Sequence, residues 1–152
     1  MVKEMTDKLT KQKRSENMSK IHGKDTSLEI KVRKYLYHHG FRYRKNVSDL
    51  PGRPDILISK YGTVIFVNGC FWHHHHGCKL ATIPKSNTKY WKDKIDKNVK
   101  RDIRNIQLLE QMEYHVIIVW ECEIKECFEL RMENLISEIK EYELFIKHDI
   151  LD

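Results

Sequence analysis

The pattern of hydrophobic and polar positions divides most of the chain into short helices and strands. The segment Thr26-Ser-Leu-Glu29 has the form of a capping box, in which the Thr26 hydroxyl accepts a hydrogen bond from a backbone N–H near Glu29. A helix is therefore predicted from Thr26 to about Gly40, where glycine is a natural stop. Its apolar face comprises Leu28, Val32, Tyr35, Leu36 and His39.

Three short β-segments are predicted after this helix. Residues 41–45 alternate like a strand with one exposed face, and residues 55–59 and 63–67 predict a hairpin around Lys60-Tyr-Gly62. The two prolines within residues 50–54 leave little helical option and predict a turn or a stiff loop.

The second half of the chain predicts a long helix, an apolar strand and a final helix. The long helix spans residues 87–112, and residues 115–120 are so apolar that we expect this strand at the centre of the sheet. The apolar positions are Trp91, Ile95, Val99, Ile103 and Ile106 on the long helix, and Phe128, Leu135, Ile139 and Tyr142 on the last. The order α-β-β-β-α-β-α predicts an α/β fold with a mixed sheet covered by helices.

Length and charge add a domain boundary and a class of partner. The 152 residues suit one domain with its own core, which we place at residues 26–152. The net charge of +6 favours a polyanionic partner, nucleic acid first. Basic residues concentrate between Lys8 and Lys24, so residues 1–25 are predicted to form a basic N-terminal arm with a short helix near residues 15–21. A solvated flexible terminus would have a similar composition.

Cellular location constrains the cysteines. No apolar run is long enough to span a bilayer, and the first residues lack a signal-peptide core, so we expect a cytoplasmic protein without membrane association. In that compartment the cysteines are expected to be buried thiols or metal ligands rather than disulfides. They are Cys70, Cys78, Cys122 and Cys127.

Residues 69–78 carry the densest chemistry in the chain, with the sequence Gly-Cys-Phe-Trp-His-His-His-His-Gly-Cys. Imidazole and thiolate are common zinc ligands, and imidazole also transfers protons near neutral pH. The segment could therefore hold a metal, perform acid–base chemistry, or do both. A solvated loop is the alternative interpretation, although the flanking cysteines and aromatic residues would be costly to expose.

The predicted hairpin brings Asp55 to the same end of the sheet as Val67 and Asn68. A carboxylate beside a backbone carbonyl is the oxygen environment that Mg²⁺ prefers, and a nearby histidine could take a proton from water. This arrangement predicts a centre that cleaves phosphodiesters. Asp55 alone would be interpreted as a turn residue after Pro54.

A zinc site is a separate question at this stage. Cys78 ends the histidine segment and Cys122 directly follows the apolar strand. Neither belongs to a C-x-x-C pair, so a buried thiol and a zinc ligand are equally compatible with the spacing. A tetrahedral site would need an imidazole and one further ligand.

Four sequence blocks together resemble the very short patch repair (Vsr) family of DNA mismatch endonucleases. The blocks are Pro51-Gly-Arg-Pro-Asp55, Val67-Asn-Gly-Cys-Phe-Trp-His73, Tyr90-Trp91 with Lys94, Asn98, Arg101 and Asp102, and Val119-Trp-Glu-Cys122. The resemblance implies a restriction-endonuclease-like fold with a structural zinc site. It also implies an enzyme that nicks one strand on the 5′ side of the thymine in a T·G mismatch, the product of 5-methylcytosine deamination.

The resemblance also implies catalytic roles. Asp55 would bind Mg²⁺ together with the backbone carbonyl of Val67, His73 would be the base acting on the attacking water, and Glu29 would hold a water or the histidine. Asn68 stands where well-known members have a second histidine. An asparagine can orient water or phosphate but cannot carry a proton.

For zinc, the resemblance implies a closed structural site. Its ligands would be His75, Cys78, Asp102 and Cys122. Gly77 looks like an insertion before Cys78, which leaves His76 as the alternative imidazole. Counting from the shared Trp72-His73 favours His75.

For DNA, the resemblance implies an aromatic wedge of Phe71, Trp72 and Trp91, inserted beside a mismatch where unstacking costs less. Trp91 could equally be core packing on its own helix. Met18 and Ile21 match arm positions that approach the other groove.

The expected partner is therefore double-stranded DNA with a T·G mismatch, bound by a monomer. A cytosine-5 methyltransferase, a polymerase and a ligase would be functionally linked to the nick. Two alternatives stay open here: a related sequence-specific endonuclease of the restriction type, and a zinc-stapled DNA-binding module without catalysis.

Overall fold

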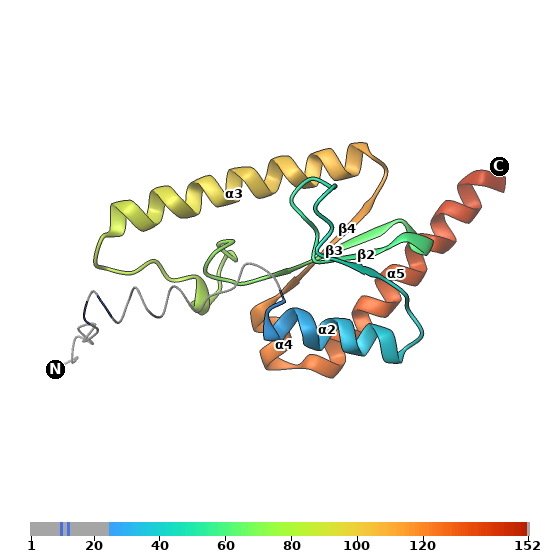
Figure 1. Ribbon diagram of the computed structural model, residues 1–152, viewed down its shortest axis with the longest axis horizontal. Coiled ribbons are helices and arrows are strands. Elements are labelled where there is room, and N and C mark those ends of the chain that lie inside the picture. Colours follow the sequence, from blue (N-terminus) through green and yellow to red (C-terminus); the bar gives the residue numbers. More distant parts are fainter. Residues whose placement is uncertain (1–9, 11, 13–24, 152) are drawn as a thin grey trace.

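The computed structural model describes residues 10, 12 and 25–151 (Figure 1). The predicted short helix near residues 15–21, with Met18 and Ile21, lies outside the described residues. The helices are α2 (Ser27–His38), α3 (Thr88–Gln111), α4 (Glu121–Glu126) and α5 (Phe128–Leu151), with 3-10 turns η1 (Ser59–Tyr61) and η2 (Lys79–Ala81). The strands are β1 (Arg44–Lys45), β2 (Ile56–Ile58), β3 (Thr63–Asn68) and β4 (His115–Trp120).

The described strands form one mixed sheet in the order β1-β2-β3-β4. The β1–β2 and β2–β3 pairs are antiparallel, and β3 and β4 are parallel, with Ile65 opposite Ile117. The parallel pair needs a long crossover, which α3 supplies. The predicted mixed sheet and the predicted hairpin are both confirmed; η1 and Gly62, with a φ of 58°, make the turn.

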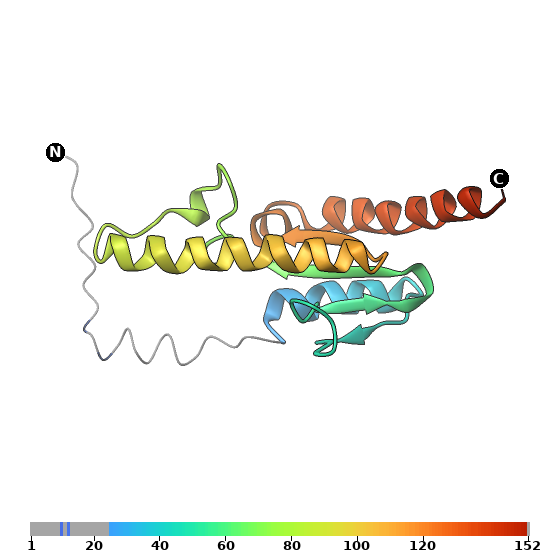
Figure 2. The same ribbon diagram turned by 90° about the horizontal axis from the view of Figure 1, so that it is seen from above.

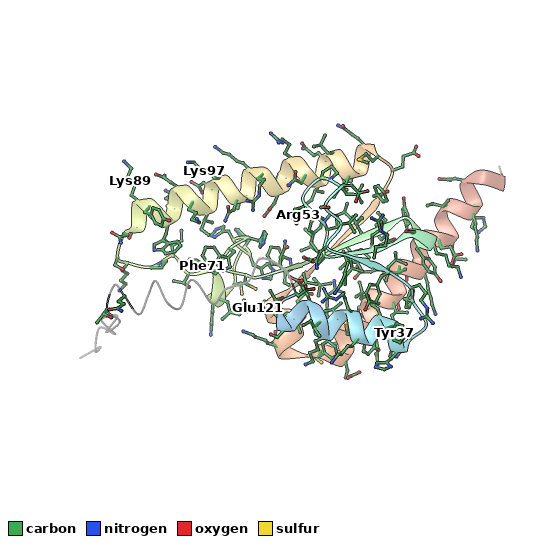
Figure 3. The ribbon with its side chains drawn as sticks, in the orientation of Figure 1. Tyr37, Arg53, Phe71, Lys89, Lys97 and Glu121 are labelled. Carbon is green, nitrogen blue, oxygen red and sulfur yellow. The ribbon has the colours of Figure 1, made fainter. Side chains whose placement is uncertain are left out.

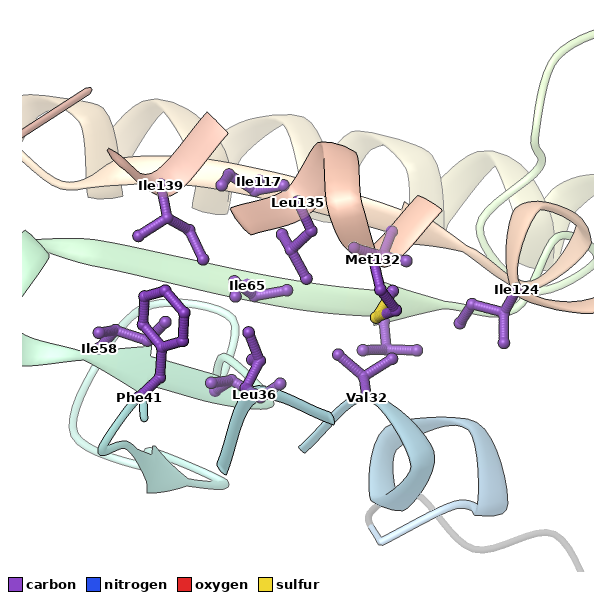
Figure 4. Close-up of a cluster of buried hydrophobic side chains, with 13 residues drawn as sticks. Val32, Leu36, Phe41, Ile58, Ile65, Ile117, Ile124, Met132, Leu135 and Ile139 are labelled. Atoms are coloured by element: carbon purple, nitrogen blue, oxygen red, sulfur yellow. The ribbon is translucent and has the colours of Figure 1, made fainter. Parts of the chain in front are cut away.

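Helices cover both faces of the sheet. Figures 1 and 2 show α3 along one face, while α2, α4 and α5 lie on the other. Alternate side chains of the strands therefore enter two cores. Against α2 and α5 the sheet presents Ile56, Ile58, Ile65, Val67, Ile117 and Val119 (Figure 4). Against α3 it presents Leu57 and Val64, which pack with Leu109, Phe66 and Val116.

Three sequence predictions differ from the structure. β4 lies at an edge of the sheet, not at its centre; its apolar character comes from helices on both faces. Residues 41–45 contribute only the two-residue strand β1. A separate helix, α4, starts directly after β4, because the Glu123 side chain accepts a hydrogen bond from the Trp120 N–H and caps it.

The start of α2 and the loop before β2 set up the site. The Thr26 hydroxyl accepts a hydrogen bond from the Glu29 N–H at 3.3 Å, so the predicted N-cap is confirmed. Gly52 has a φ of 75°, and a Cβ there would lie 3.1 Å from that of Asn105 on α3. Only glycine lets this loop approach α3 so closely.

Candidate active site and metal centre

One broad cleft lies between the start of α2, the loop before β2, the end of β3 and α3. Its volume is about 1210 Å³. Figure 3 shows Arg53 and Phe71 on the side of α3 that faces the sheet and α2, where the cleft lies. The sequence-predicted residues that line it are Glu29, Asp55, Val67, Asn68, Phe71, Trp72 and His73. Residues that are distant in the sequence therefore converge on one cavity.

Asp55 directly precedes β2, is partly buried and lies beside Val67 near the end of β3. Its Oδ2 accepts a hydrogen bond from the Val67 N–H at 2.7 Å. The pKa of Asp55 is raised to about 7, chiefly by burial and then by the charge of Glu29, while the Val67 N–H, His73 and Arg33 act in the opposite direction. Two acids close together in a buried place favour a cation beside them. Glu29, at 3% exposure, and Asp55 could together hold a divalent cation.

His73 is oriented by a carboxylate from α3. Its Nδ1 lies 2.6 Å from Oδ2 of Asp102, and both side chains are partly buried. With an ionised Asp102 the proton sits on Nδ1, which leaves Nε2 as the basic nitrogen. The charge of His73 acts on Asp55, and both residues line the same cleft. A water between them could meet an acidic group on one side and a base on the other.

A smaller cavity of about 400 Å³ adjoins the cleft at His73 and Asn68. Its walls include Arg53, Arg101 and Arg104. Asn68 is only 6% exposed, so its amide faces these two cavities rather than bulk solvent. Basic side chains beside a buried amide are suited to phosphate groups.

A second centre is formed by four residues within and around the histidine run, whose ligand atoms all lie within 4.8 Å of one another. The atoms belong to Cys70, His75, Cys78 and Cys122. Nδ1 of His75 is 3.3 Å from the Cys122 Sγ and 3.6 Å from the Cys70 Sγ. Ligands about 2.3 Å from a tetrahedral zinc would be about 3.8 Å apart, so three thiolates and an imidazole fit this ion.

Two further contacts hold this cluster. The His75 ring stacks on Trp120, with centroids 4.2 Å apart and planes 7° apart. The Cys122 N–H donates to the Cys70 Sγ at 3.4 Å. Burial raises the pKa of Cys70 to about 12, whereas the Leu80 backbone lowers that of Cys78. The cluster joins the histidine loop to the start of α4.

The predicted ligand set differs from this cluster at one position. Asp102 is paired with His73 and is not among the clustered residues; Cys70 takes the fourth place. His76 is exposed, and His75 supplies the clustered imidazole. The spacing Cys70-x₄-His75-x₂-Cys78 was the available signal for this set, and a search for C-x-x-C pairs does not detect it.

The three predicted wedge residues form one aromatic cluster. Phe71 is 5.1 Å from Trp72 and 5.5 Å from Trp91, and the two tryptophans are 5.9 Å apart, all with steeply inclined planes. All three rings are only partly buried, so Trp91 is not an ordinary core residue. Asn98 of α3 donates to the Trp72 carbonyl oxygen at 3.0 Å and fixes the loop that carries two of these rings.

Comparison with known proteins identifies the class of this site. A family model described as DNA mismatch endonuclease Vsr matches residues 6–80. The type II nicking enzyme V.NmeAIP of Neisseria meningitidis is 52% identical over 140 residues, which cover 90% of this chain and 99% of that enzyme. The DNA mismatch endonuclease Vsr of Escherichia coli is 41% identical over 138 residues, covering 91% and 88%. The type II nicking enzyme V.XorIIP of Xanthomonas oryzae is 40% identical over 135 residues, covering 88% and 98%.

The fold, the cleft and these relatives together define a DNA-nicking endonuclease. More specifically, the chain belongs to the Vsr family of DNA mismatch endonucleases. The sequence resemblance and the prediction of a DNA-nicking enzyme are thereby confirmed. Within the described residues, no helix is both long and apolar enough to cross a membrane.

Proposed function

We propose that this protein is a Mg²⁺-dependent enzyme that nicks one DNA strand on the 5′ side of the thymine in a T·G mismatch. The observation that carries the proposal is the convergence of a buried acid, a partly buried acid and a carboxylate-paired histidine on one cleft, next to an aromatic cluster. The acids are Glu29 and Asp55, and the histidine is His73. A cleft with basic side chains along its wall, Arg53 and Arg101 among them, suits the sugar–phosphate backbone.

The chain's own residues supply the base and the ligands. Nε2 of His73 takes a proton from the attacking water, whose oxygen bonds to phosphorus as the bond to the 3′ oxygen breaks. The leaving 3′ oxygen takes a proton from solvent water, so the products are a 3′ hydroxyl and a 5′ phosphate. Asp102 holds the imidazole in the required tautomer and stabilises its protonated form. Asp55, with the Val67 carbonyl and support from Glu29, would hold Mg²⁺, which neutralises charge on the scissile phosphate and the leaving oxygen.

Asn68 takes a different role from a histidine. Its buried amide faces the catalytic cleft and the adjoining arginine-lined cavity, so it orients a phosphate oxygen or a water without exchanging a proton. One imidazole, that of His73, then serves as the only base of the reaction.

The cysteine–histidine cluster is proposed to bind a structural zinc ion. Four protein ligands leave no open position for substrate, so this ion would fix the histidine loop against the start of α4 rather than take part in hydrolysis. The loop carries His73 at one end and Cys78 at the other, so zinc would hold the catalytic base in place.

The aromatic cluster is proposed to enter the base stack beside the mismatch. Phe71, Trp72 and Trp91 already contact one another edge to face, so inserting them requires little new order. Met18 and Ile21 of the basic arm would approach the other groove. The protein would act as a cytoplasmic monomer. Its substrates would arise at cytosines methylated by a cytosine-5 methyltransferase, and a polymerase and a ligase would complete the repair after the nick.

A nicking assay tests the proposal directly. Duplexes with one T·G pair in varied flanking sequences are incubated with the protein, with and without Mg²⁺. We expect a single nick 5′ of the thymine that leaves a 5′ phosphate, and none in matched T·A duplexes. Absence of nicking with Mg²⁺ in every sequence context would contradict the proposal.

The names of two relatives favour a second candidate. V.NmeAIP and V.XorIIP are called type II nicking enzymes, so a related enzyme that nicks a particular fully paired sequence is the alternative. The same assay distinguishes the two, because equal nicking of T·G and T·A duplexes would favour sequence over mismatch as the target.

A further inference from the structure

A buried arginine lies directly behind the acidic site. Arg33 of α2 is 6% exposed, and its Nη2 donates to the Asp25 Oδ1 at 2.9 Å. Its Nη1 lies 3.5 Å from the Glu29 Oε2 and has no hydrogen-bond partner among the described residues. A buried charge is normally retained only where it is paired, so the position of this guanidinium is tied to both acids.

The contacts of Arg33 continue to the backbone of Asp55. The Asp25 N–H donates to the Glu29 Oε2 at 2.8 Å, and the Asn46 side chain donates to the Asp25 Oδ1 at 3.0 Å. The Asn46 backbone N–H then donates to the carbonyl oxygen of Asp55 at 3.1 Å. Asp25 and Asn46 both have left-handed φ values, of 53° and 49°. Such backbone conformations persist where the surroundings enforce them.

We propose that Arg33 is a positioning residue which, with Asp25 and Asn46, holds the Glu29 carboxylate beside Asp55 so that the two acids form one cation site. This inference rests on the proposed Mg²⁺-dependent nicking. Arg33 is not among the residues that line the cleft, so it would act through Glu29. Its planar fork can reach Asp25 and Glu29 together, which the single ammonium group of a lysine cannot reproduce.

The direction of the change in Mg²⁺ response distinguishes a positioning role of Arg33 from a purely electrostatic one. Removing a positive charge close to two acids would, by electrostatics alone, strengthen the attraction for a cation. A weaker response to Mg²⁺ after Arg33→Met would therefore report a displaced Glu29. Arg33→Lys retains the charge but loses the fork, so we expect it to restore the response only in part.

The experiment measures the Mg²⁺ concentration that half-saturates nicking, the affinity for T·G duplex without Mg²⁺, and Mn²⁺ binding to the DNA-free protein by electron paramagnetic resonance. Arg33→Met should raise the half-saturating concentration and weaken Mn²⁺ binding by about tenfold or more, with DNA affinity unchanged. Arg131→Met is the matched control, because the Arg131 side chain of α5 is only 10% exposed and is likewise paired with two acids, Glu123 of α4 and Glu138 of α5. It should lower thermal stability without changing the Mg²⁺ response.

A double variant tests whether Arg33 acts through Glu29. In a Glu29→Gln background, adding Arg33→Met should change the Mg²⁺ response by less than about twofold, because the group that Arg33 positions is already lost. If Arg33→Met does not fold, Asn46→Gly removes the neutral side chain that donates to Asp25 while tolerating the left-handed φ at this position. Because no charge changes, a weaker Mg²⁺ response in this variant would also report a displaced Glu29.

Three results would overturn the inference: an unchanged or stronger Mg²⁺ response in Arg33→Met, full rescue by lysine, or additive effects in the double variant. Failure of the wild-type protein to nick with Mg²⁺ would count against the proposed function instead. Mn²⁺ binding to the DNA-free variants would still decide the role of Arg33 in that case.

Discussion

The acidic cleft around Asp55 and the cysteine–histidine cluster are joined by residues 67–78 but offer a metal opposite surroundings. The cleft presents carboxylate oxygens to a large cavity with room for water and phosphate. The cluster presents three sulfurs and one imidazole nitrogen, which together would fill a tetrahedral set. Oxygen ligands in an open cleft suit a hard, catalytic cation, whereas a closed sulfur-rich set suits a structural one. Residues 67–78 thus connect a cleft suited to catalysis with a cluster suited to a structural role.

The largest expected effect is on the nicking rate, after a substitution that alters the cleft and leaves the cluster intact. Asp55→Ala should lower the rate of T·G nicking by more than about 10³-fold, because the site loses its main carboxylate ligand. Mismatch binding, measured by gel shift, and zinc content should be unchanged. Asp49→Ala is the control, since Asp49 is exposed, contacts Arg44 on the surface and is not among the residues that line the cleft. Residual nicking above a tenth of the wild-type rate would show that Asp55 is not essential.

The second prediction breaks the cluster. Cys70→Ser should abolish zinc binding and lower the free energy of unfolding by about 3–5 kcal/mol, because metal binding contributes directly to folding stability. Metal analysis and urea unfolding measure the two effects. Cys127→Ser, at an exposed cysteine outside the cluster, should change neither. A variant at Cys70 that keeps one equivalent of zinc would restore Asp102 as a candidate ligand.

The third prediction tests whether Asp102 acts with His73 in the cleft or belongs to the cysteine–histidine cluster. Asp102→Asn should lower kcat by about 100-fold, since the amide no longer fixes the tautomer of His73 or stabilises its protonated form. Zinc content should stay at the wild-type value, because Asp102 contacts His73 and lies outside the cluster. Asp96→Asn, at an exposed position of the same helix, is the control. Loss of zinc in Asp102→Asn would contradict the assignment.

Local sequence patterns predicted most of the elements but not their neighbours. The α2 cap, the hairpin and α3 follow from spacing within short segments, and the structure confirms them. The edge position of β4 could not be predicted, because an apolar strand can be covered by helices as well as by strands. Ile103, predicted on the buried stripe of α3, is 52% exposed. Residues spaced by four drift about 40° per step around a helix, so a run of such spacings leaves the buried face.

The candidate site shows the same limit. The family resemblance indicated residues that now line one cleft, while their catalytic roles stay predictions. Neither the Arg33–Asp25 contact nor the place of Cys70 in the cluster was predicted. Both depend on partners brought together by the fold: Asn46 lies 21 positions from Asp25, and Cys122 lies 52 from Cys70. A sequence pattern identifies candidate ligands, and only the fold decides which of them meet.

The smallest expected effect is on the free energy of unfolding, which the raised pKa of Asp55 makes dependent on pH. The pKa of Asp55 is about 7 in the folded protein, against an ordinary value of 3.8. Between these values the folded state holds a proton that the unfolded state releases, so stability falls as pH rises from about 4 to 7. Asp55→Asn, which needs no proton, should therefore raise the free energy of unfolding by about 2–3 kcal/mol at pH 8 and by little at pH 4.

Urea unfolding without added Mg²⁺ measures this difference, and no chelator is used, so that any zinc stays bound. Adding Mg²⁺ at pH 8 should stabilise the wild-type protein and leave Asp55→Asn unchanged, because ligand binding to the folded state adds stability only where the site exists. A stability gain that is equal at both pH values would indicate better packing by asparagine rather than relief of a buried charge. In the cysteine–histidine cluster the corresponding exchange, Cys70→Ser, is expected to lower the free energy of unfolding instead of raising it. The buried charge of Asp55 is thus expected to lower stability in the cleft, whereas metal binding is expected to raise it in the cluster.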